Sequence, residues 1–285
     1  MSPLISDRHS IRTKVLLGFI AVASVLLINM VAFLLMMQSF YENTSIEKRI
    51  LAVVPANKDI LLAKNLYIQS GQRAHSQKVL DSVAKLEVEI DRIKLETDDA
   101  ITIKHLEDIY KNLNLIRAGF EDYTVIEDQL SALEARFYNV SNELAAQADG
   151  VRKEISNQRM LDKGTLAVSE KISDIERLIL LQRIYENDLN LTGPQDSAQI
   201  DSNINRIIDD GNKVKDILAE HGAGVLGYRI VRLAVEYRDI LKQYSDFKQQ
   251  QLKSEQNMNT SISEIVATCE TAASTISASI NQSMV

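Results

Sequence analysis

The chain is poor in the residues that break helices or that build sheets. Its 285 residues include 10 glycines and 3 prolines, aromatic residues make up 5%, and tryptophan is absent. A sheet needs β-branched and aromatic runs bounded by turn residues, so this composition favours long helices. The single cysteine, Cys269, permits no internal disulfide. Because Cys269 lies on an apolar helical repeat, we interpret it as a core residue rather than a nucleophile.

Signals of nucleic-acid binding and of catalysis are also missing. The formal net charge of −7 disfavours a nucleic-acid partner, which calls for a basic patch. The sequence holds no glycine-rich phosphate loop and no catalytic constellation. The histidines lack the spacing of metal ligands; they are His9, His75, His105 and His221. We therefore expect no enzyme, no cofactor and no metal site.

The chain does contain one long hydrophobic run, Val15–Met37, with no charged residue. At about 1.5 Å per residue it spans about 34 Å, enough to cross the hydrocarbon core of a bilayer. A buried helix of a soluble domain would show a polar stripe, and a cleaved signal peptide has a shorter apolar core of about 7–15 residues. The run therefore predicts a retained transmembrane helix.

The flanks of this run predict its orientation. Arg8, Arg12 and Lys14 precede it, against the single acid Asp7. Basic residues concentrate on the cytoplasmic side of membrane helices. We therefore expect residues 1–14 to form a cytoplasmic tail and residues 38–285 to lie outside the cytoplasm.

Apolar residues recur at three- and four-residue spacing through the remainder of the chain, which predicts helices. Glycines mark several predicted ends, as at Gly71 and Gly193, while Pro55 is expected to kink the first helix after the membrane. The predicted helices cover approximately residues 46–70, 74–96, 101–161, 168–191, 194–220 and 225–285.

The lengths of these helices predict an all-α architecture. Two helices are about 90 Å long and four are shorter. The pair Lys64-Asn65 with Gly71, and the pair Glu186-Asn187 with Gly193, repeat at the same offset. One transmembrane helix followed by two stacked four-helix bundles accommodates this pattern. The expected membrane-proximal bundle covers about residues 40–130 and 250–285, and the distal bundle about residues 131–249.

Polar residues on the buried stripe of the first helix mark a candidate binding site in the proximal bundle. Asn57 and Lys64 occupy stripe positions. Lys64 either extends past the stripe to solvent or offers a cation to an anionic ligand. By helix rise, Lys64 lies level with Tyr123, and Arg117 flanks the level of Asn57. We expect these four residues to line a polar pocket.

A second candidate site lies in the distal bundle. Four polar residues fall within about one turn, and helix rise places them level with two tyrosines of the last helix. Stripe tyrosines also serve as core residues with a satisfied hydroxyl, and this alternative stays open. The candidates are Gln182, Arg183, Tyr185, Glu186, Tyr237 and Tyr244.

The order of a membrane span, hairpin, long helix, hairpin and long helix resembles methyl-accepting chemotaxis receptors with a helical bimodular sensor domain. The likeness covers Gln38–Val285, and Ser10–Phe19 also looks like the start of such receptors. The resemblance implies a homodimer in the bacterial inner membrane, with a periplasmic sensor for a small molecule such as an organic acid. It further implies chemotactic output through kinase-coupling machinery, reached by a cytoplasmic part after Val285.

Related sensor domains suggest two alternatives to a chemoreceptor. The chain is also compatible with the input domain of a sensor histidine kinase, or with a sensor that docks a periplasmic binding protein. Organic-acid sensors of this kind are expected to use arginines on the inner face of the first helix. Here that face offers Asn57 and Lys64 instead.

Overall fold

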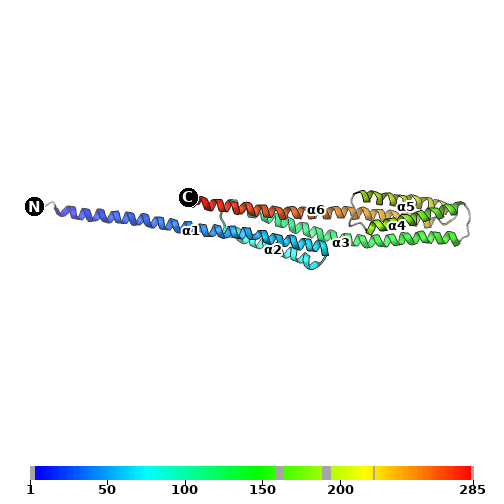
Figure 1. Ribbon diagram of the computed structural model, residues 1–285, viewed down its shortest axis with the longest axis horizontal. Helices are drawn as coiled ribbons and strands as arrows, with labels where there is room; N and C mark the ends of the chain where they lie inside the picture. The colour runs from blue at the N-terminus through cyan, green and yellow to red at the C-terminus, as the bar shows by residue number, and fades with distance from the viewer. Residues whose placement is uncertain (1–3, 158–162, 188–193, 221, 284–285) are drawn as a thin grey trace. The chain divides into compact units, whose positions relative to one another are not determined.

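The computed structural model describes residues 4–157, 163–187, 194–220 and 222–283. These residues form six helices and no strand, which confirms the predicted all-α class (Figure 1). The helices are α1 (Leu4–Ser70), α2 (Arg73–Glu96), α3 (Ala100–Asn157), α4 (Lys163–Asn187), α5 (Pro194–Glu220) and α6 (Gly224–Ser283).

Local hydrogen bonds account for several helix ends. Gly71 has a φ of 64° and its N–H donates to the Tyr67 carbonyl at 2.7 Å, as a helix-ending glycine does. Gly222 likewise has a φ of 73° at the end of α5. At the start of α3, the Asp99 carboxylate accepts hydrogen bonds from the N–H and the hydroxyl of Thr102 at 2.8 and 2.6 Å. Asp99 therefore caps the N-terminus of α3.

Helix α1 continues through Pro55 without a break. Pro55 lies on the exposed side, and Leu51, whose carbonyl loses its partner to the proline, is exposed as well. Water can therefore satisfy that carbonyl, which accounts for the unbroken helix at this proline. One consequence is that a single helix carries both the apolar residues 15–37 and the stripe that follows them.

Within the described residues, α1 is the one helix long and apolar enough to cross a membrane. None of its apolar window is buried inside the protein. Phe19, for example, is 72% exposed and Leu27 is 66% exposed. Such continuous apolar exposure is unusual on a soluble surface, and it fits a segment that is surrounded by lipid.

The chain divides into two compact units. Unit 1 comprises Met1–Phe120 and Glu255–Val285, and unit 2 comprises Glu121–Ser254. Unit 1 thus contains α1, α2, the first part of α3 and the last part of α6, with α2 lying beside the second half of α1 (Figure 1). Unit 2 contains the rest of α3 and α6 together with α4 and α5. Sequence reasoning placed the divisions at 130/131 and 249/250.

The core of unit 1 contains the predicted stripes. Cys269 of α6 is fully buried there, and burial raises the pKa of its thiol to about 12, which suits a core residue and not a nucleophile. The stripe of α1 is buried over its whole predicted length: Ile46, Ile50, Val53, Asn57, Ile60, Lys64 and Tyr67.

The core of unit 2 is built from apolar residues of α3, α4, α5 and α6. At Gly227, α6 approaches α5 so closely that a Cβ atom would lie 2.4 Å from the Cα atom of Lys215. Backbone atoms cannot yield as a flexible side chain can. Glycine is therefore required at position 227 by the approach of two helices, and not by its own backbone angles.

We predict that Gly227→Ala destabilises unit 2. The added methyl group forces α5 and α6 apart, which lowers the free energy of unfolding by about 1–3 kcal/mol. Chemical denaturation of the full chain in detergent, followed by circular dichroism, measures the change.

Gly150→Ala is the matched control, because a Cβ atom at this helical glycine of α3 meets no atom within 4 Å. Alanine has a higher helix propensity than glycine, so this variant should be neutral or more stable by up to about 1 kcal/mol. Equal effects of the two substitutions would contradict the proposed close approach at Gly227.

Candidate ligand-binding site

Polar contacts connect α1 to α6 in unit 1, from the buried Asn57 and Lys64 to a partly exposed Glu255 and an exposed Asn259. The side-chain amide of Asn57 donates a hydrogen bond to the carbonyl of Ile262 at 2.7 Å. The ammonium of Lys64 donates to Oδ1 of Asn259 at 2.8 Å and lies 3.5 Å from Oε1 of Glu255. Residue numbers rise along α1 as they fall along α6, so the two helices run antiparallel here. We call Asn57, Lys64, Glu255 and Asn259 the polar seam.

Lys64 is 1% exposed, so the interpretation that its side chain extends past the stripe to solvent is wrong. Lysine is almost never fully buried unless its charge is paired. Burial lowers the pKa of Lys64, and the neighbouring Glu255 carboxylate opposes that effect only in part. The seam therefore holds a cation whose desolvation its partners do not fully offset.

Asn57 is fully buried, and its Oδ1 atom accepts no hydrogen bond within the described part of the protein. A buried polar atom without a partner costs about 1–3 kcal/mol. The seam thus combines a cation in a weak ion pair with an unsatisfied acceptor less than two helical turns away on α1. A small molecule that carries both an anionic group and a hydrogen-bond donor would satisfy both.

The other two predicted residues of this site are Arg117 and Tyr123. Arg117 of α3 forms an ion pair with Glu87 of α2 and is partly exposed. Among the described contacts, none joins Arg117 to the polar seam. Tyr123 is buried and belongs to unit 2. Of the four predicted residues, Asn57 and Lys64 thus belong to the polar seam, and Arg117 pairs with Glu87.

In unit 2, both tyrosines of the predicted distal site are core residues. The ring of Tyr237 stacks on Phe137, with ring centroids 4.5 Å apart. The hydroxyl of Tyr244 donates to Glu134 at 3.2 Å, and burial raises the pKa of Tyr244 to about 12. The remaining four candidates lie in α4, and their side chains lie outside those that the structure describes: Gln182, Arg183, Tyr185 and Glu186.

Sequence reasoning missed Glu255 and Asn259, which follow Lys64 by nearly two hundred positions. A usable signal was present, however. Glu255 lies seven residues before Ile262 and fourteen before Cys269, on a face where the other members are apolar. Glu255 is partly buried on α6 and carries a charge opposite to that of the buried Lys64 on α1, so the two are natural partners across antiparallel helices.

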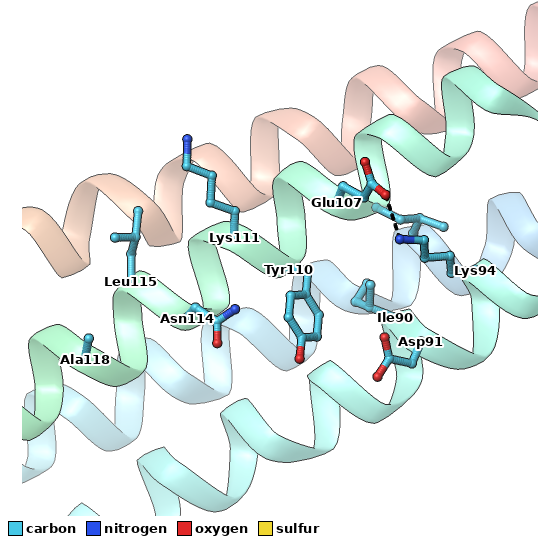
Figure 2. Close-up of a pocket in the computed structure, with 10 residues that line it drawn as sticks. Ile90, Asp91, Lys94, Glu107, Tyr110, Lys111, Asn114, Leu115 and Ala118 are labelled. Carbon is cyan, nitrogen blue, oxygen red and sulfur yellow. Dashed lines mark hydrogen bonds and ion pairs between the residues drawn. The ribbon is translucent and has the colours of Figure 1, made fainter.

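A groove lies between α2 and α3 on the outside of unit 1 and has a volume of about 590 Å³ (Figure 2). Ile90 and Leu106 are its buried apolar members, at 1% and 0% exposure. An ion pair between Lys94 and Glu107, with an N···O distance of 2.7 Å, lies at one end. The groove is separate from the polar seam, since none of the seam residues lines it.

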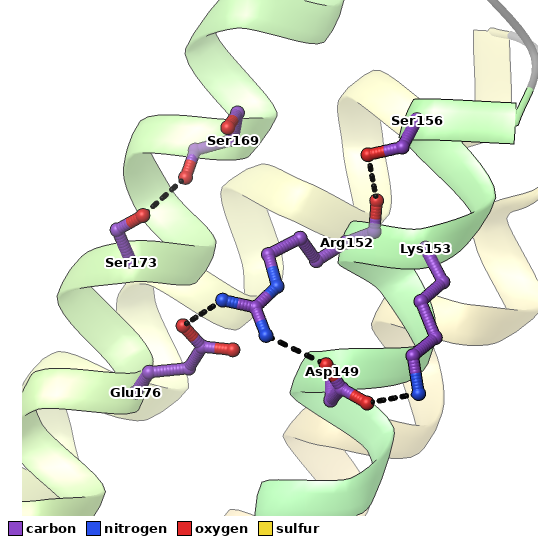
Figure 3. A network of polar contacts seen from close by, with 7 residues as sticks. All are labelled: Asp149, Arg152, Lys153, Ser156, Ser169, Ser173 and Glu176. Atoms are coloured by element: carbon purple, nitrogen blue, oxygen red, sulfur yellow. Dashed lines mark hydrogen bonds and ion pairs between the residues drawn. The ribbon is translucent and has the colours of Figure 1, made fainter.

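An ion-pair network among the described residues of unit 2 joins α3 to α4 (Figure 3). The guanidinium of Arg152 contacts Asp149 at 2.7 Å and Glu176 at 3.4 Å, and Lys153 contacts Asp149 at 2.6 Å. Arg152 and Lys153 are more than half exposed. Exposed pairs of this kind contribute little, about 0–1 kcal/mol, and these side chains already satisfy one another. We therefore interpret the network as a surface contact that joins α3 to α4.

Comparison with known proteins identifies the sensor part of the chain. The family model of the helical bimodular sensor domain matches residues 47–272. The match includes every residue of the polar seam. No curated protein matches the chain. A sensor domain is not a catalytic family, in agreement with the absence of a catalytic constellation from the sequence.

We predict that Lys64→Met preserves or raises stability at neutral pH. Methionine keeps an unbranched side chain of similar length and removes the desolvation of a charge. Loss of one partner is costly where the other charge stays buried, but the Glu255 side chain is 31% exposed and its carboxylate can turn to water. Lys64→Ala instead leaves a cavity and should lower the free energy of unfolding by about 2–5 kcal/mol. Denaturant titration of the full chain in detergent distinguishes the two variants.

The pH dependence should differ between wild type and Lys64→Met. Because burial lowers the pKa of Lys64 in the folded state, the unfolded state binds the proton more tightly. Wild type should therefore gain stability relative to the methionine variant as pH rises from neutral towards about 10, the ordinary lysine range. Parallel stability curves for the two proteins would show that Lys64 titrates normally.

Proposed function

The chain belongs to the family of helical bimodular sensor domains, and from this premise we propose that it is the sensor region of a transmembrane chemoreceptor. In this role it binds a small molecule outside the cytoplasm and passes the signal inward for chemotaxis. The observation that carries the proposal is that α1 is one continuous helix. This helix contains the apolar run 15–37, and it also supplies the buried Asn57 and Lys64 of the polar seam.

The location follows from the same helix. The basic residues before Val15 favour a cytoplasmic N-terminus, so the residues after Met37 would lie in the periplasm of a bacterium. The receptor would act as a homodimer, as the resemblance to chemotaxis receptors implies. Its output would pass to the kinase-coupling machinery in the cytoplasm.

The ligand that the polar seam favours is a small organic acid with a hydroxyl or similar donor. Its carboxylate would take the place of the Glu255 carboxylate beside Lys64, where the present N···O distance of 3.5 Å indicates a weak contact. Its donor would reach Oδ1 of Asn57, which has no partner in the described structure. Charge-assisted hydrogen bonds of this kind are about twice as strong as neutral ones, which supports recognition of an anion.

Signalling would arise from the displacement of one helix against the other. A ligand shifts an equilibrium only by binding one arrangement more tightly than another. Release of Glu255 from Lys64 would loosen the contact between α1 and α6 at that level. A slide of about 1–2 Å would then suffice, because helices shift past each other at such amplitudes without unfolding. Helix α1 would convey that slide to its apolar segment.

A thermal-shift screen of the full chain in lipid nanodiscs against small organic acids tests this function. A ligand at 100 times its dissociation constant should stabilise the protein by about 2.7 kcal/mol. We predict that Lys64→Met remains folded but binds such a ligand at least about tenfold more weakly, because it lacks the cation.

Lys104→Met serves as the matched control, since Lys104 is an exposed lysine of α3 in unit 1 and has no ion pair in the described structure. It should bind the same ligand as wild type does. A ligand that stabilises wild type and Lys64→Met equally would place the binding site outside the polar seam.

A further inference from the structure

The groove between α2 and α3 has the dimensions and the composition of a ligand site. Its volume of about 590 Å³ falls within the range of small-molecule pockets, about 300–1,000 Å³. Buried Ile90 and Leu106 provide an apolar surface, and Leu115, which is 50% exposed, extends it. An apolar surface with a few polar groups is typical of pockets that hold a small organic molecule.

Three polar side chains extend into this groove. Asp91 of α2 and Tyr110 and Asn114 of α3 point into the space between the two helices (Figure 2). None of the three makes a side-chain hydrogen bond or ion pair within the described part of the protein. A carboxylate, a phenol oxygen and an amide oxygen can all accept hydrogen bonds, so the groove offers several free acceptors to one occupant.

The charges in the groove favour a cation. Lys94 and Glu107 neutralise each other at one end. Lys111 also lines the groove, but its ammonium extends to the opposite side of α3 from Asp91 and Tyr110 (Figure 2). The carboxylate of Asp91 is therefore the charge that faces the space without compensation. The ring of Tyr110, which is 37% exposed, adds an electron-rich face that attracts cations.

We propose that this groove binds an organic amine with an apolar aryl or alkyl part. The ammonium group donates to Asp91 and lies against the ring of Tyr110. The apolar part covers Ile90 and Leu106. Organic anions are repelled by Asp91 and do not bind there. This site differs from the polar seam in its place, in its open access to solvent and in the charge of its ligand.

Phenethylamine is a suitable probe, because it joins an ammonium group to an aromatic ring through a short linker. Isothermal titration of the full chain in nanodiscs should show saturable binding, after subtraction of partition into empty nanodiscs. 3-Phenylpropionate has the same ring and the opposite charge, and it should not bind. Absence of saturable phenethylamine binding, or equal binding of the two probes, overturns the proposal.

Asp91→Asn tests the carboxylate and should weaken phenethylamine binding at least about tenfold, since it removes the charge-assisted hydrogen bond. Asp91 is exposed, so the variant should keep the helical circular dichroism of wild type. Asp108→Asn is the matched control: it removes an exposed carboxylate of α3 that does not line the groove, and binding should stay unchanged. Equal affinities of wild type and Asp91→Asn overturn the proposal.

Substitutions of Tyr110 test independently whether its aromatic ring contributes to amine binding. Tyr110→Phe keeps an aromatic face and should retain most of the affinity, whereas Tyr110→Leu should lose several-fold. Lys64→Met should leave phenethylamine binding unchanged, because Lys64 lies in the polar seam. This result separates the amine site from the organic-acid site, so that either can fail without the other. If Tyr110→Leu binds as wild type does, the ring has no part in recognition and the proposed site is wrong.

Discussion

The positive charge of Lys64 in the core of unit 1 sets the arrangement of α1 against α6. An ammonium group that is removed from water must be compensated by nearby groups, or the core would exclude it. Glu255 and Asn259 of α6 supply that compensation at 3.5 and 2.8 Å. A slide of the two helices by one turn, about 5.4 Å, would carry the ammonium away from both partners. The pairing therefore favours one register.

The apolar stripes alone would not determine the register of α1 against α6. Isoleucine, valine and leucine recur along these stripes at each turn, so neighbouring alignments bury similar areas. The bond from Asn57 to the Ile262 carbonyl adds a second fixed point, two turns from Lys64. Both fixed points lie on α1, the helix that also carries the apolar run. These contacts are connected to the apolar run 15–37 by uninterrupted helix, and Pro55 does not break that connection.

The sequence predicted the helices and their ends well because these depend on local signals. Gly71 and the cap at Asp99 act within a few residues of themselves, and the spacing of apolar residues identifies the buried face of each helix. At Pro55 the helix continues, because the proline lies on the solvent side, where water can replace the missing hydrogen bond.

Partners across the bundle were harder to predict because they depend on tertiary register. Asn57 and Lys64 were recognised as unusual, but their partners on α6 were not. Arg117 was grouped with them by level along the axis, while the structure gives it a nearer acid, Glu87. Helix rise predicts the height of a residue and not the side of the bundle that it faces. The partners in interhelical ion pairs could therefore be assigned only from the structure.

The most direct test of the central claim measures the register of α1 against α6 by disulfide formation. Asn57 meets Ile262, so the residues seven positions away in each helix, Ile50 and the native Cys269, face each other across the antiparallel pair. Cysteines must lie within about 7 Å, Cα to Cα, to bond. Ile50→Cys should therefore crosslink to Cys269 faster than a cysteine at position 46 or 53 does.

The same three positions are then compared in a chain that also carries Asn57→Val and Lys64→Met. If the polar contacts fix the register, their removal lets α1 slide, and crosslinking should spread from position 50 to positions 46 and 53. An unchanged preference for position 50 would show that the apolar stripes alone hold the helices in place, and it would contradict the account.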